Sequence, residues 1–61
     1  MNYKIEALNW VREYGQANTD YLSALHAIEF LIDNALEVAE TKEDFNLCES
    51  ARKQALNILN R

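Results

Sequence analysis

A histidine and three acids recur at helical spacing in the middle of the chain. They are His26, Glu29, Asp33 and Glu37, at i, i+3, i+7 and i+11, so all four fall on one side of a helix. Imidazole and carboxylate groups one turn apart can share a metal ion. A single helix offers too few ligands, however, and the chain has one histidine, so no second His motif completes a metal-binding bundle. We interpret the four residues as a solvated acidic face and expect no metal and no cofactor.

The single cysteine, Cys48, is the other candidate for chemistry, as a nucleophile beside His26. Its position in the pattern predicts an inner helix face, whereas His26 falls on an outer one, and a buried thiol is usually inert. The sequence also lacks a nucleophile elbow and a glycine-rich phosphate loop. We therefore expect no enzymatic activity. One free thiol without a recognisable export signal indicates a reducing cytoplasm.

Three helices must position these residues, and apolar periodicity predicts them at about 3–14, 20–40 and 42–61. The chain has no proline and one glycine, so we expect breaks only near 15–19 and 40–42. The short second break favours an antiparallel helical hairpin, to which the shorter N-terminal helix is added. The fold class is therefore all-α, in a single domain that spans residues 1–61.

Local signals mark the ends of these helices. Gly15 suits a left-handed stop after the first helix. A side-chain oxygen can cap the second helix from any of three residues, Asn18, Thr19 or Asp20. Thr41 and Asp44 stand at the spacing of a capping box at the start of the third helix.

The hairpin has one apolar seam on each helix. On the second helix the seam follows alternating four-three spacing through Tyr21, Leu25, Ile28, Ile32, Ala35 and Ala39. On the third helix the inner stripe is Phe45, Cys48, Ala51, Ala55 and Leu59. Alanines on both helices would let the two axes approach closely. Arg52 lies at the edge of the inner stripe, where it can pair with an acid of the second helix or cover apolar surface with its stem.

Two further sets of apolar residues lie outside these seams. Leu22 and Phe30 form a second stripe on the second helix, with His26 between them and the acids Glu29, Asp33 and Glu37 alongside. Either the first helix covers this stripe, or it is exposed and meets a partner protein. The first helix is apolar over most of its circumference, and its aromatic residues Tyr3, Trp10 and Tyr14 are candidates for self-association. Whether that helix packs on its own chain or on a second one is open.

Size and charge limit the function. A chain of 61 residues has a marginal core, and 49% of this one is apolar, so we expect a homodimeric bundle. A formal charge of −4 weighs against nucleic acid and anionic membranes, and no run of about 18 apolar residues predicts a membrane span. Acidity suits a basic protein surface instead.

These limits favour a non-enzymatic protein-binding module, a small cytoplasmic regulator or inhibitor that occupies a partner's surface. Compact acidic proteins of this length are typical of phage or mobile-element inhibitors of host machinery, although no residue establishes such an origin. Two alternatives are open. The first is a dimer that binds nucleic acid through Lys4, Arg12, Arg52, Lys53 and Arg61. The second is an acidic DNA mimic.

Overall fold

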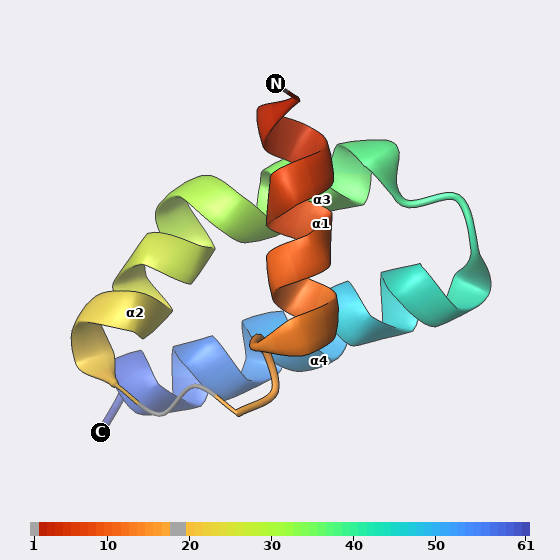
Figure 1. Cartoon of the computed structure of the whole chain (residues 1–61). Coiled ribbons are helices and arrows are strands. Elements are labelled where there is room, and N and C mark those ends of the chain that lie inside the picture. The colour runs from red at the N-terminus through yellow and green to blue at the C-terminus, as the bar shows by residue number, and fades with distance from the viewer. Residues whose placement is uncertain (1, 18–19) are drawn as a thin grey trace.

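The computed structural model describes residues 2–17 and 20–61, and over these residues the fold is all-helical, with no strand. Its elements are α1 (Tyr3–Glu13), α2 (Tyr21–His26), the π-helical segment η1 (Ala27–Leu31), α3 (Ile32–Val38) and α4 (Lys42–Leu59). Because α2, η1 and α3 follow one another without a break, the described part of the chain forms three helices, as predicted. After α3 the chain turns, and α4 then runs beneath the bent second helix (Figure 1).

A side-chain oxygen caps the N-terminus of each of the three helices. Asn2 accepts hydrogen bonds from the backbone N–H groups of the first turn of α1. Asp20 caps α2, 3.2 Å from the backbone nitrogen of Ser23. The other two predicted caps of this helix, Asn18 and Thr19, lie outside the described residues. The polar residues between the apolar runs therefore determine where helices begin.

Gly15 ends α1 for a different reason from the one predicted. Its φ is not positive, so the left-handed stop is wrong. The residue is buried, and a Cβ there would lie 2.9 Å from the carbonyl oxygen of Val11 and 3.3 Å from the Cβ of Ala51. Glycine is needed because α1 ends in close contact with α4, and a methyl group would not fit between them.

The second helix does not keep the single straight seam that was predicted for it. The π segment η1 adds a residue to one turn, which rotates the following residues by about 100° relative to a regular helix. Beyond this turn Ile32 and Ala35 are buried as expected. In α2 the buried residue is Ala24, at the start of η1 it is Ala27, and Tyr21 is exposed. The helix bends at this place (Figure 1), so α2 and α3 meet the rest of the chain with different faces.

The inner face of α4 is rotated slightly from the predicted stripe. Cys48, Ala51 and Ala55 are buried as predicted. Phe45, however, is 42% exposed, and Ile58 is buried in its place near the other end of the helix. At the start of α4 the buried residue is Asp44, which binds Arg12 of α1, and at the other end Ile58 packs with Ala24 of α2.

Helix α1 packs on its own chain, which resolves one of the open alternatives. Ala7, Leu8 and Val11 are buried in the same cluster as Ile32 and residues of α4. In Figure 1, α1 crosses α3 and ends over α4, and it contacts both. The remaining large apolar side chains of α1 are exposed or half-buried; they are Tyr3, Ile5, Trp10 and Tyr14.

We predict that Gly15→Ala destabilises the fold by about 1–3 kcal/mol, because the new methyl group overlaps backbone atoms that cannot yield cheaply. Urea denaturation followed by circular dichroism measures the effect. Ala17→Ser, at an exposed position of the same connection, is the control and should shift stability by no more than about 0.5 kcal/mol. Equal midpoints for Gly15→Ala and the wild type would contradict the crowding of Gly15 between the Val11 backbone and Ala51.

A second prediction concerns the alanines between helices. Ala35→Leu and Ala51→Leu should each lower stability by about 1–3 kcal/mol, because both positions are fully or almost fully buried and extra methylene groups force the backbones apart. The same denaturation experiment applies, and a stabilised or unchanged Ala51→Leu chain would contradict the close packing.

Candidate protein-binding surface

The stripe formed by Leu22 and Phe30 is exposed in this structure. Leu22, on α2, is 71% exposed, and Phe30, in η1, is 50% exposed. His26 lies between them, with its ring centroid 5.2 Å from that of Phe30 and the two planes tilted by 45°. Of the two interpretations of this stripe, the structure supports the one in which α1 does not cover it. Two large apolar side chains at the surface of so small a chain need an explanation.

Helix α1 borders this surface without covering it. Trp10 lines a shallow hollow of about 200 Å³ together with Leu22, His26 and Leu31. The Tyr3 hydroxyl lies 3.4 Å from the carbonyl oxygen of Phe30, to which it donates a hydrogen bond. Two sets of residues that the sequence placed on separate helices therefore meet on one face. We call this set Tyr3, Trp10, Leu22, His26, Phe30 and Leu31 the aromatic face.

The π segment shapes the centre of the aromatic face. The Phe30 carbonyl oxygen accepts two hydrogen bonds, one from the side-chain amide of Asn34 and one from the Tyr3 hydroxyl. Two side-chain donors at one carbonyl anchor the backbone where the helix changes its winding, and π turns are frequent at functional sites. Neither Trp10 nor Leu31 was predicted to belong to the partner-binding surface, because their approach depends on how α1 crosses the second helix.

The three acids of the predicted flank are exposed, and two of them form ion pairs with other helices. Asp33 pairs with Arg52 of α4 at 2.7 Å, which is the kind of pairing foreseen for Arg52. Glu37 pairs with Lys4 of α1. Both acids are therefore engaged within the chain, although their side chains stay largely exposed. Glu29, within η1 itself, is exposed beside the aromatic face.

The aromatic residues predicted for self-association do not all lie on one surface of their own. Tyr3 and Trp10 belong to the aromatic face, and Tyr14 is exposed at the C-terminal end of α1. An occupant of the aromatic face therefore excludes a second occupant that uses Tyr3 or Trp10. The sequence pattern treated these residues as independent because it does not place one helix relative to another.

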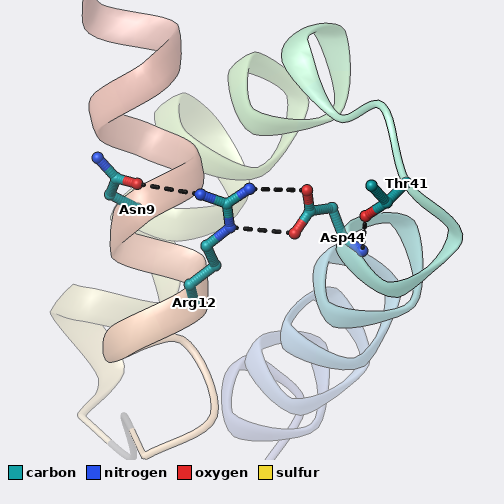
Figure 2. A network of polar contacts seen from close by, with 4 residues as sticks. All are labelled: Asn9, Arg12, Thr41 and Asp44. Atoms are coloured by element: carbon teal, nitrogen blue, oxygen red, sulfur yellow. Dashed lines mark hydrogen bonds and ion pairs between the residues drawn. The ribbon is translucent and has the colours of Figure 1, made fainter.

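A bidentate ion pair between Arg12 and Asp44 holds α1 against α4. Figure 2 shows the Arg12 guanidinium donating two hydrogen bonds to Asp44, with Nε 3.0 Å from Oδ1 and Nη2 2.8 Å from Oδ2. Asn9 accepts a third bond from Arg12. Thr41 accepts from the backbone N–H of Asp44 at 3.1 Å, so half of the predicted capping box is present. The carboxylate that would complete it binds Arg12 instead.

This contact changes the ionisation of both partners. The hydrogen bonds from Arg12 lower the pKa of Asp44 below its usual value, against the opposing effect of burial, and Thr41 acts in the same direction as Arg12. The same hydrogen bond raises the pKa of Arg12. The pair therefore stays charged around neutral pH and holds α1 against the start of α4 as a bidentate clamp.

The candidates for chemistry do not come together. Cys48 is fully buried, whereas His26 is exposed. Burial raises the pKa of the Cys48 thiol, and the nearby carboxylates of Asp44 and Glu49 add to that shift, so the reactive thiolate is disfavoured. Within residues 2–17 and 20–61, no three His, Cys, Asp or Glu side chains gather as they would around a metal ion.

Comparisons of the chain with protein-family models, with curated proteins and with solved structures find no match. Among the described helices, none combines the length and the apolar character needed to cross a lipid bilayer. The function is therefore inferred from the surfaces of this chain.

The Arg12–Asp44 clamp leads to a pH-dependent prediction. A carboxylate whose pKa is lower in the folded chain stabilises the fold above its unfolded pKa of about 3.9, and that stabilisation is lost as the pH falls through the folded pKa. Asp44→Asn should therefore lower the urea midpoint at pH 7, and its gap to the wild type should close as the pH approaches about 2. The exposed acid Asp33 provides the control, Asp33→Asn, with a smaller effect at pH 7. A gap that is the same at every pH would contradict the assignment.

Proposed function

We propose that this protein is a non-enzymatic binding module, a small regulator or inhibitor that works by occupying the surface of a partner protein. The observation that carries the proposal is the exposure of Leu22 and Phe30 beside the hollow lined by Trp10. A few large apolar or aromatic side chains around a hollow provide most of the affinity in typical protein interfaces. The partner would insert an apolar side chain into the hollow and cover Phe30.

The negative charge of the chain would raise the rate of association with a partner more than the affinity for it. The chain carries a formal net charge of −4, and Glu29 is exposed next to the aromatic face. Such a field speeds the approach of a basic partner and is screened by salt. The pairing of Asp33 and Glu37 within the chain leaves Glu29 as the acid of the predicted set best placed for this role.

The alternative of nucleic-acid binding is weakened by the same ion pairs. Of the basic residues proposed for it, Lys4, Arg12 and Arg52 are each paired with a carboxylate of the chain. Binding phosphate through these groups would require breaking contacts that hold the helices together. The DNA-mimic alternative is weakened as well, because Asp33, Glu37 and Asp44 are the acids in these pairs and their charges are already partly neutralised.

A homodimer in the cytoplasm, encoded by a phage or mobile element, remains part of the proposal. The helical hairpin formed by the second helix and α4 would be its scaffold. Tyr3 and Trp10 lie on the aromatic face, so two copies that associated through them would block the partner. A homodimer compatible with partner binding must therefore form elsewhere on the chain.

The experiment is affinity purification of the tagged chain from its host, followed by mass spectrometry and by titration of the identified partner. Leu22→Ala and Phe30→Ala should each weaken binding about tenfold or more, because interface anchors of this size contribute about 1.4 kcal/mol or more. Ile5→Ala, a similarly exposed apolar residue of α1, should leave the affinity unchanged.

Helicity, followed by circular dichroism, should be unchanged in all three variants. A Phe30→Ala chain that unfolds would show that the residue belongs to the core, and one that binds like the wild type would remove the aromatic face as the binding site.

A further inference from the structure

One flank of α4, beside its buried face, carries a stripe that is complementary to itself. Its members are spaced four, three and four residues apart; they are Phe45, Glu49, Arg52 and Leu56, and we call them the α4 stripe. The two ends of the stripe are apolar, and its centre holds one acid and one base. Four-three spacing is the pattern by which two helices pack along each other.

The α4 stripe is accessible. Phe45 is 42% exposed and Leu56 is 41% exposed, and both lie outside the buried face of the helix. Glu49, Arg52 and Leu56 line the same open hollow on the surface of α4. In Figure 1, α4 lies along one edge of the molecule, with the other helices on its inner side. A second helix can therefore approach along the stripe.

Arg52 is already oriented at the centre of the stripe. Its Nη2 donates to Asp33 at 2.7 Å, which holds the guanidinium in place. Its Nη1 lies 3.8 Å from the Glu49 carboxylate of the same chain, too far for a hydrogen bond. A guanidinium has five N–H donors, so Arg52 can bind a second carboxylate while it keeps Asp33. Glu49 is largely exposed and can accept from a second guanidinium.

These four residues have a symmetry that points to one occupant. Positions 45 and 56 share their midpoint with positions 49 and 52, between Ser50 and Ala51. If two copies of α4 lie antiparallel about a two-fold axis at this midpoint, Phe45 of each copy meets Leu56 of the other, and Glu49 of each meets Arg52 of the other. In a parallel arrangement, like charges would meet. Two-fold interfaces require this kind of self-complementarity.

We propose that the α4 stripe is the interface of a homodimer in which two copies of α4 pack antiparallel. This proposal concerns the homodimer alone and does not depend on a partner protein. The stripe is about 16 Å long, from its 11-residue span at 1.5 Å per residue. So short an interface is at the small end of stable ones, so the dimer is concentration-dependent. It leaves the aromatic face of both copies open.

Charge reversal tests the pairing by sedimentation from about 1 µM to about 1 mM. The wild type should pass from monomer to dimer in this range. Glu49→Arg and Arg52→Glu should each be monomeric alone, because each places like charges opposite one another. An equimolar mixture of these two variants should recover the dimer as a heterodimer, since every charge then meets its opposite. Circular dichroism confirms that both variants remain folded.

Oxidative cross-linking tests the register independently. An equimolar mixture of the Phe45→Cys and Leu56→Cys chains should form a disulfide-linked dimer. Phe45→Cys alone should not, because its two copies lie about 16 Å apart across the axis, beyond the reach of a disulfide of about 7 Å. The wild-type chain is the control for cross-linking through the native Cys48, which is buried.

Three results would overturn the proposal. The first is a wild type that stays monomeric at about 1 mM. The second is that the two charge variants dimerise like the wild type. The third is a dimer that is lost in Phe30→Ala but kept in Glu49→Arg. The last result would move the interface to the aromatic face. Loss of partner binding in Phe30→Ala with the dimer intact would leave the two proposals separate, so either can fail without the other.

Discussion

The structure depends on close contact between helix backbones at small residues. Six of the eleven buried apolar residues among those described are alanines, distributed over all three helices. Gly15 extends this pattern, because even a methyl group would not fit between α1 and Ala51. A core of alanines brings the helix axes near one another but encloses few large side chains. Many of the large apolar residues therefore lie on the surface, although a few, such as Ile32 and Ile58, are buried.

This arrangement explains why so small a domain has two unusual outer surfaces. On one, Leu22, Phe30 and the half-buried Trp10 surround a hollow at the π turn. On the other, Phe45 and Leu56 bracket a pair of opposite charges on α4. A single chain of 61 residues buries little apolar surface of its own, so covering either surface by another chain would add to its stability. The two surfaces differ in symmetry, which is why we propose a foreign partner for one and a second copy of the chain for the other.

Ion pairs hold α1 against its neighbouring helices. The charged side chains in these pairs are then not free to bind a ligand. Arg12 binds Asp44 in a bidentate contact, and Lys4 reaches Glu37. One pair links α1 to α3 and the other links it to α4, so together they hold α1 at the angle at which it crosses these two helices. That angle in turn leaves the aromatic face open. The paired charges of this chain therefore stabilise its fold, and its net negative charge acts at longer range.

The amino-acid sequence by itself determined the helical content, the places where helices begin, and the burial of Cys48, Ala51 and Ala55, because each follows from contacts within one helical turn or from a single period. It did not determine the phase of the second helix, since one π turn changes which residues face inward and no local signal marks it. Nor did it place Trp10 beside Leu22, because that contact joins two helices. Only the tertiary structure decided that the aromatic face is open, since the exposure of a side chain depends on what the rest of the chain leaves uncovered.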